Sequence, residues 1–272
     1  MFFDLKLVVL GLLVGYVSGL FGKGGSAIAT PLLQLIGVPA FFAVASPLPA
    51  AIPGTLVASI AYLRQGLYSK SIVLWSIAVG LPATILGAWL SKYAGGPALL
   101  LASNLVIVGL GLSFLIPYAY ASRPTEGIAA AVHPPPPLLP ADTTQEVNLP
   151  VTIAVAVIVG FISGLLANSG GFLFAPLYHK VLKLPLKTAF ACSLLVSAAL
   201  AVPGTLVHIY LHHIDWHVVT IFALGSIPLS YLGARTAIKM PVKALEPLFG
   251  IMLTLIGTWG MLDSLGWHFL RL

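Results

Sequence analysis

The chain has 272 residues, of which 59% are hydrophobic and only 7% are charged, and its formal net charge is +6. Several stretches run for about 20 residues without a charged side chain, which is long enough to cross the hydrocarbon core of a bilayer. These stretches lack the polar face of a soluble helix, and the single cysteine, Cys192, leaves no pair for an internal disulfide. The composition therefore predicts an integral membrane protein, in which basic loop residues set the topology rather than bind nucleic acid.

Five hydrophobic segments fill the first part of the chain, residues 1–117. We place them at residues 5–22, 26–37, 40–63, 71–91 and 97–117. The second segment has about twelve residues, and a helix of that length rises about 18 Å, too little to cross about 30 Å of hydrocarbon. We therefore predict that the first two segments form a short hairpin, which enters the membrane and turns at its Gly-rich tip, Gly22 to Ser26.

A proline-rich linker, residues 118–148, comes next. Four consecutive prolines, Pro134 to Pro137, lie at its centre. Such a run cannot be helical, because proline has no backbone N–H to donate and its ring restricts the chain to extended conformations. We predict a solvated connector with no chemistry of its own.

The second part, residues 149–272, also contains five hydrophobic segments. We place them at residues 149–167, 172–182, 188–211, 216–234 and 242–262. Its second segment is again short, and the hairpin tip before it runs from Ala167 to Gly171. Eight of the ten segments are predicted to be long enough to span, with the two short ones completing the hairpins.

The two parts repeat each other. Val14–Leu20 matches Val159–Leu165 at an offset of 145 residues, and Pro53–Val57 returns letter for letter as Pro203–Val207. Because five is odd, the second part must enter the membrane from the opposite side. The predicted fold is an all-α polytopic membrane protein made of two inverted repeats, and matching helix breaks in such repeats are typical of a transporter's binding site.

The lysines and arginines agree with this inversion. Ten of them fall on one predicted face and three on the other. The first group is Lys23, Arg64, Lys70, Arg123, Lys180, Lys183, Lys187, Arg235, Lys239 and Lys243, and the second is Lys6, Lys92 and Arg271. Since cytoplasmic loops carry the excess of positive charge, we predict a cytoplasmic linker and both termini outside.

The two hairpin tips are the predicted substrate site. Glycines there leave backbone N–H groups uncovered, and a helix begins just after each tip, so its positive end points into the gap and favours an anion. The candidate residues are Lys23, Gly24, Gly25 and Ser26 in the first tip and Asn168, Ser169, Gly170 and Gly171 in the second. Two alternatives stay open: small residues that merely allow close helix packing, and a Lys23 side chain that reaches the cytoplasmic surface instead.

A second candidate layer comes from the repeated Pro-Gly-Thr motif. Its prolines should kink both helices, and Thr55 and Thr205 either line the cavity or bond carbonyls of their own helices. Ser46 and Ser193, at the start of the same segments, either face the pathway or pack. His208 is an alternative proton carrier.

Catalytic and metal chemistry has little support in the sequence. No carboxylate lies deep inside a predicted span: Asp4, Asp215 and Asp263 lie near segment ends, and Glu246 lies close to the start of the last segment. A sodium site or a carboxylate proton relay therefore has no obvious ligand, and we expect no metal and no cofactor. A membrane enzyme would need a nucleophile–base pair or a metal cluster, and neither is visible. We therefore predict a carrier and not an enzyme.

These features resemble the sulfite exporter TauE/SafE family of anion transporters. The resemblance rests on Gly19 to Pro31, Gly164 to Pro176 and the paired Pro-Gly-Thr motifs, and it covers nearly the whole chain outside the linker. It implies a protein of the bacterial or archaeal inner membrane that exports sulfite, sulfoacetate or related organosulfonates. An importer or a proton-coupled carrier of another small organic anion is the alternative. The expected partners are the anion and the lipid bilayer, without nucleic acid, and a homodimer stays open.

Overall fold

The computed structural model describes residues 2–22, 25–90, 96–121, 148–166, 170–210 and 212–264. All regular structure within these ranges is helical, so the predicted all-α class is confirmed. The helices are α1 (Phe2–Leu20), α2 (Ser26–Leu35), α3 (Ala40–Ala45), α4 (Pro47–Leu63), α5 (Lys70–Leu90), α6 (Gly96–Ala121), α7 (Leu149–Leu165), α8 (Gly171–Lys180), α9 (Leu186–Tyr210), α10 (Trp216–Lys239) and α11 (Val242–Ser264). The predicted linker lies outside the described residues.

Six helices in the described ranges are long and apolar enough to cross a membrane. They cover Phe2–Leu20, Phe42–Leu63, Lys70–Leu90, Leu186–Tyr210, Trp216–Lys239 and Val242–Leu262. The sequence predicted eight such spans. The other two expected spans are α7, which has 17 residues, and α6, which has 26 residues and no charged side chain.

One segment, 40–63, was predicted as a single helix and is divided into α3 and α4. The break falls at Ser46, whose N–H still bonds the carbonyl of Phe42 at 2.9 Å. Pro47 and Pro49 follow, and neither can donate a backbone hydrogen bond to the preceding turn, so a new helix starts with Pro47 in its first turn. The matching segment of the second part has serine instead of the first proline, at Ser197, and α9 runs unbroken.

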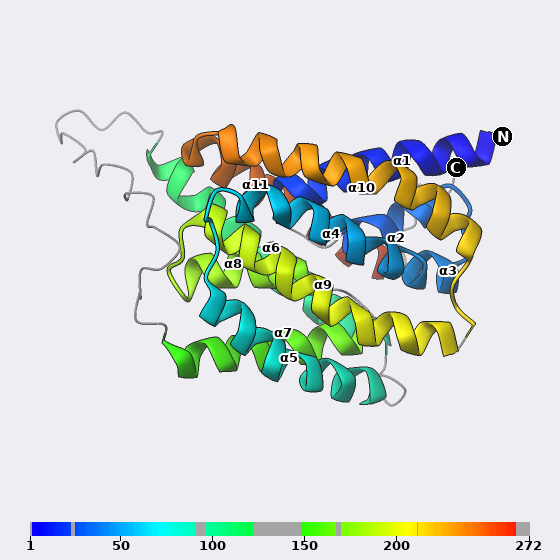
Figure 1. Ribbon diagram of the computed structural model, residues 1–272, viewed down its shortest axis with the longest axis horizontal. Coiled ribbons are helices and arrows are strands. Elements are labelled where there is room, and N and C mark those ends of the chain that lie inside the picture. Colours follow the sequence, from blue (N-terminus) through cyan, green and yellow to red (C-terminus); the bar gives the residue numbers. More distant parts are fainter. Residues whose placement is uncertain are drawn as a thin grey trace.

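The helices of the two parts interleave. Figure 1 shows α1 and α10 along one edge of the molecule, α5 and α7 along the other, and α4 and α9 between them. Each outer pair thus joins a helix from the first part to one from the second. The two central helices contact each other, and α4 also contacts α10 while α9 contacts α5.

Glycines allow both outer pairs to pack at close range. A Cβ atom on Gly15 or Gly19 of α1 would overlap the backbone of α10, and one on Gly164 of α7 would overlap the carbonyl oxygen of Thr84 in α5. In the same way, a Cβ atom on Gly87 or on Gly233 would overlap the backbone of the helix that this glycine faces. Small residues that let backbones touch are the usual interface of membrane helices, so in these pairs the glycines are part of the packing.

One end of the molecule is strongly basic. Figure 1 shows the α4–α5 loop, the α8–α9 loop and the α10–α11 junction at the end opposite the N-terminus of α1. Arg64 Nη1 donates to the Tyr231 hydroxyl at 3.4 Å, and Lys187 Nζ donates to the Ile238 carbonyl at 2.6 Å. The helix ends and loops gathered here carry Arg64, Lys70, Lys180, Lys183, Lys187, Arg235, Lys239 and Lys243.

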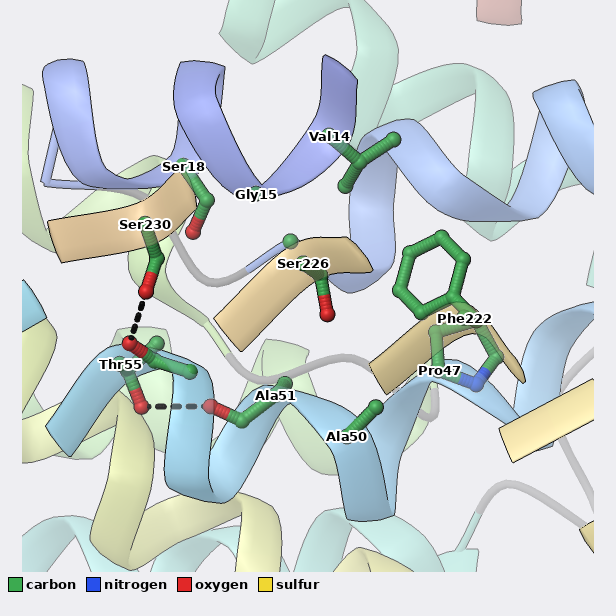
Figure 2. Close-up of a pocket in the computed structure, with 12 residues that line it drawn as sticks. Val14, Gly15, Ser18, Pro47, Ala50, Ala51, Thr55, Phe222, Ser226 and Ser230 are labelled. Atoms are coloured by element: carbon green, nitrogen blue, oxygen red, sulfur yellow. Dashed lines mark hydrogen bonds between the residues drawn. The ribbon is translucent and has the colours of Figure 1, made fainter. Parts of the chain in front are cut away.

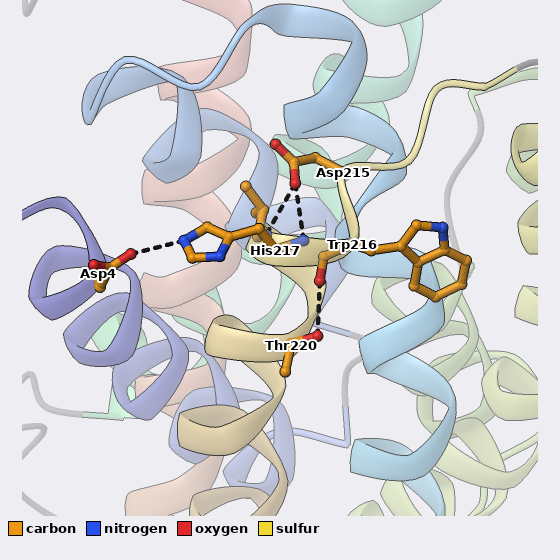
Figure 3. Close-up of polar contacts among 6 residues, drawn as sticks. Asp4, Asp215, Trp216, His217 and Thr220 are labelled. Carbon is orange, nitrogen blue, oxygen red and sulfur yellow. Dashed lines mark hydrogen bonds and ion pairs between the residues drawn. The ribbon is translucent and has the colours of Figure 1, made fainter. Parts of the chain in front are cut away.

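At the opposite end, polar contacts fix the start of α10 (Figure 3). The Asp215 carboxylate accepts from the N–H groups of His217 at 2.9 Å and Val218 at 3.2 Å, and so caps the helix. The His217 ring reaches Asp4 of α1 across 2.8 Å. The Ser46 hydroxyl accepts from the Asp215 N–H at 3.1 Å, so this candidate residue holds the α3–α4 junction against α10.

Candidate functional site

A small cavity lies between α1, α4 and α10, beside the turn that precedes α2. Its interior has room for about one water molecule. The lining residues are Val14, Gly15, Ser18, Gly25, Pro47, Ala50, Ala51, Gly54, Thr55, Phe222, Ser226 and Ser230. Figure 2 shows α4 on one side of this cavity and α1 with α10 on the other. The site therefore combines elements of both parts of the chain.

None of these twelve described lining residues carries a charge, and the polar groups are hydroxyls. Thr55 Oγ1 donates within its own helix, to the carbonyl of Ala51 at 2.7 Å. Ser230 Oγ lies 2.8 Å from the carbonyl of Gly54 in α4 and 2.7 Å from that of Ile227 in its own helix, so its hydroxyl is shared between the two. For Thr55 the sequence left two readings open, and the structure has both: the residue lines the cavity and bonds its own helix.

Ser226 differs from these two residues. It is buried, with 6% of its surface exposed, and its Oγ has no hydrogen-bond partner among the described residues. Figure 2 shows the hydroxyl directed into the space between α10 and α4. An unpaired buried hydroxyl costs about 1–3 kcal/mol. Ser226 thus offers a donor that the folded protein leaves available at the cavity.

The start of α2 adds a second kind of donor. Gly25 lines the cavity and is the N-cap residue of α2, without a side-chain cap. Its carbonyl accepts from the N–H groups of Ile28 and Ala29, at 3.2 and 3.0 Å, as a helix start requires. The preceding N–H groups of a first turn have no acceptor within the helix, and the positive end of the helix dipole lies there. An anion at this end of the cavity would meet favourable dipoles and no lining carboxylate.

The structure brings together only some of the predicted site residues. Gly25 and Thr55 line the cavity, and the backbone of Ser26 opens α2. Lys23, Gly24, Asn168 and Ser169 lie outside the described residues, as does the side chain of Ser26. The remaining candidates are Ser46, Ser193, Thr205, Gly170 and Gly171, and none of them is among the cavity-lining residues.

The described end of the predicted second tip, Gly170 and Gly171, is held by contacts of its own. Gly170 has a left-handed backbone, with φ of 71°, and caps the start of α8. A Cβ atom there would overlap the Ser163 hydroxyl, so the close approach requires glycine. Ser193 Oγ donates to the Gly171 carbonyl at 2.9 Å, which ties α9 to this tip. The residues around the turn, including Phe172 and Phe174, are buried.

Three further buried polar atoms lie on α9. Ser197 Oγ, Thr205 Oγ1 and His208 Nδ1 have no hydrogen-bond partner within the described ranges. The His208 ring lies 5.6 Å from that of His213. Of these, sequence reasoning considered Thr205 and His208 and missed Ser197.

Ser226 was also missed, although its sequence carries a signal. Ser226 and Ser230 are four residues apart, one helical turn, in a segment that is otherwise apolar from Val218 to Leu232 apart from Thr220. Polar side chains that recur on one face of a membrane helix indicate a cavity or a helix contact. A search for such pairs would have found it.

No group of three or more His, Cys, Asp or Glu side chains that could hold a metal ion occurs in the described ranges. The chemistry that the cavity supports is therefore binding by neutral donors and dipoles. Proton abstraction or nucleophilic attack would need groups that its lining does not include.

Comparisons with known proteins agree with a transport role. The family model described as "Sulfite exporter TauE/SafE" matches residues 7–259. A Bacillus subtilis protein named "Probable membrane transporter protein YunE" is 27% identical, with 92% of this chain and 94% of that protein covered. A Xylella fastidiosa protein named "Probable membrane transporter protein" is 28% identical, with 92% and 91% covered.

More distant relatives carry similar names. "Probable membrane transporter protein YfcA" of Escherichia coli is 22% identical, with 97% of this chain and 92% of that protein covered. No solved structure matches the chain. The family model spans almost all of the sequence, including both hairpin tips and both Pro-Gly-Thr motifs. The chain is therefore a membrane transporter of the sulfite exporter TauE/SafE family.

Proposed function

We propose that this transporter exports small sulfur-containing anions, namely sulfite, sulfoacetate or related organosulfonates, across the cell inner membrane. The observation that carries the proposal is the chemistry of the cavity between α1, α4 and α10. It combines an unpaired buried hydroxyl, at Ser226, with the start of α2, whose N-cap residue Gly25 has no side chain to cap the helix, and its described lining has no acidic side chain. Oxyanions need donors without nearby negative charge, and both features supply them.

Lys23 would add the missing positive charge. It lies two residues before Gly25 in the same hairpin tip. A charged donor close to the cavity would neutralise part of the substrate charge. Asn168 and Ser169 would act as neutral donors in the second tip.

The proposed topology has the linker in the cytoplasm and both termini outside. The basic end of the molecule supports this orientation, since cytoplasmic ends carry the excess of Lys and Arg. Inverted repeats are supported by the directions of the helices: α1 begins at one end of the molecule, and α7 begins at the opposite end (Figure 1). The interleaved outer pairs, α1 with α10 and α5 with α7, fit the same two-fold relation.

Export needs no coupling ion in this account. A cell that is negative inside favours the exit of an anion by about 2.3 kcal/mol per charge for each 100 mV. A divalent anion gains about twice that amount. We propose voltage-driven export, in which the hairpins and central helices of one half move against the other half.

A second candidate is a proton-coupled carrier or importer of another small organic anion. It is favoured by His208, a half-buried histidine on α9 whose Nδ1 lacks a partner in the described part of the chain. A histidine side chain at this position could carry the coupled proton.

Flux measurements in proteoliposomes test the proposal. Sulfite, sulfoacetate, taurine and sulfate are loaded separately, and the efflux of each is followed with the purified protein and with protein-free liposomes. We expect protein-dependent efflux of sulfite or sulfoacetate. Transport of a cation without any anion flux would refute it, and anion flux only under an imposed pH gradient would favour the second candidate.

A further inference from the structure

The cavity has a counterpart in the second part of the chain. In the register of the repeated Pro-Gly-Thr motif, Thr55 and Gly54 of α4 match Thr205 and Gly204 of α9. In the same way α7 takes the place of α1, and α5 takes the place of α10, which are the two pairs that pack closely. The corresponding position therefore lies between α5, α7 and α9.

This counterpart retains polar groups that nothing in the described structure satisfies. Ser197 is fully buried and Thr205 is 8% exposed, and neither hydroxyl has a hydrogen-bond partner among the described residues. Ser197 occupies the place of Pro47, a residue that lines the first cavity. Two buried hydroxyls left without partners are costly, since each forgoes the bonds it makes in water. Helix packing alone does not explain why these two hydroxyls are buried without hydrogen-bond partners.

Leucine side chains fill the counterpart where alanines leave the first cavity open. Ala50 lines the cavity, and its match is Leu200, whose Cδ atoms lie 3.5 Å from where a Cβ on Gly80 would stand. Leu48 Cδ1 lies 3.7 Å from the Cβ position of Gly204.

The contact of Leu48 with Gly204 has no equivalent at Gly54, the glycine that matches Gly204. Ala198 stands at the position that matches Leu48, and no described atom lies within 4 Å of a Cβ on Gly54. The open and the filled position therefore differ by two leucine–alanine exchanges. One is at the α4–α9 contact, where Leu48 faces Gly204, and the other is at the α9–α5 contact, where Leu200 faces Gly80.

We infer that the anion occupies a second position during transport, held by the hydroxyls of Ser197 and Thr205 and closed in this conformation by Leu48 and Leu200. The inference rests on the proposed function, because the ligand is the same oxyanion. Movement of α9 against both α4 and α5 would separate Leu48 from Gly204 and Leu200 from Gly80, and so expose the two hydroxyls.

The first test separates binding from transport. The double variant Ser197→Ala/Thr205→Val should keep the sulfite Kd of the wild type within about twofold, because the first cavity is unchanged. Its sulfite efflux from proteoliposomes should fall at least tenfold. The matched control is Ser59→Ala/Thr152→Val, which removes two buried hydroxyls that bond carbonyls of their own helices, Leu56 at 2.7 Å and Asn148 at 3.1 Å. The control should transport sulfite at the wild-type rate.

A second variant opens the filled position directly. Leu200→Ala should raise the number of sulfite ions bound per chain from one toward two, measured by equilibrium binding of radiolabelled sulfite. Adding Ser197→Ala and Thr205→Val to Leu200→Ala should return the number to one.

The outcomes distinguish this inference from the proposed function. Wild-type efflux in the Ser197→Ala/Thr205→Val variant overturns the second position and leaves sulfite transport intact. Loss of sulfite binding together with efflux in that variant also overturns it, since the hydroxyls would then serve the first cavity or the fold. A wild-type protein that neither binds nor moves any anion of the panel instead refutes the proposed function.

Discussion

Ser226→Ala should weaken substrate binding while making the folded protein more stable. The hydroxyl lies at the cavity and has no partner in the described structure, so alanine removes a buried polar group at no loss of internal bonds. A hydrogen bond to a charged group contributes about 1.5–3 kcal/mol, which corresponds to a rise in Kd of about 10–150-fold. Relief of the unpaired hydroxyl should stabilise the protein by about 1 kcal/mol, or raise its melting temperature by about 2–4 °C.

Isothermal titration with sulfite and thermal unfolding in detergent measure the two effects on the same preparation. Ser230→Ala is the matched control, because its hydroxyl lies 2.8 Å from the Gly54 carbonyl and joins two helices. We expect the control to lose stability and to change the Kd less than Ser226→Ala does. A Ser226→Ala protein with the wild-type Kd, or with a lower melting temperature, would show that this serine is part of the packing.

Two further variants test the remaining parts of the account. Lys23→Ala should raise the sulfite Kd by about one to two decades, because a hydrogen bond from a charged donor is lost. The control variants Lys183→Ala and Lys239→Ala should leave the sulfite Kd unchanged. A wild-type Kd in Lys23→Ala would assign binding to the backbone amides alone. Gly19→Ala places a Cβ against a backbone carbonyl of α10 and should destabilise the protein by about 1–3 kcal/mol in thermal unfolding, whereas Gly109→Ala, with no described atom within 4 Å of its Cβ, should be neutral or stabilising. Equal melting temperatures for these two glycine variants would contradict the close packing of α1 on α10.

Helix positions could be predicted from the sequence because a membrane span must be a long run without charge. The short second segments were also predicted: α2 begins at Ser26 and α8 at Gly171, within one residue of the starts of the predicted segments 26–37 and 172–182. The break at Ser46 was missed because the apolar run continues through Pro47 without any loss of hydrophobicity.

The partners of the helices could not be read from the chain. Glycines at Gly15, Gly19, Gly160 and Gly164 indicate close packing, but a stripe of small residues does not say which helix it meets. The pairing of α1 with α10 and of α5 with α7 depends on the three-dimensional arrangement of the two parts. Ser226 belongs to the cavity only through that pairing, which is why the sequence pointed to the hairpin tips and not to α10.

The most direct test of the central claim is voltage-driven efflux of sulfite. Liposomes loaded with sulfite receive an inside-negative potassium diffusion potential, with equal pH on both sides and no sodium. We expect the potential to accelerate sulfite efflux, because a charged anion that crosses alone gains about 2.3 kcal/mol per charge for each 100 mV. At low sulfite concentration, Ser226→Ala should abolish most of this acceleration. Efflux that ignores the potential and follows an imposed pH gradient would contradict the central claim.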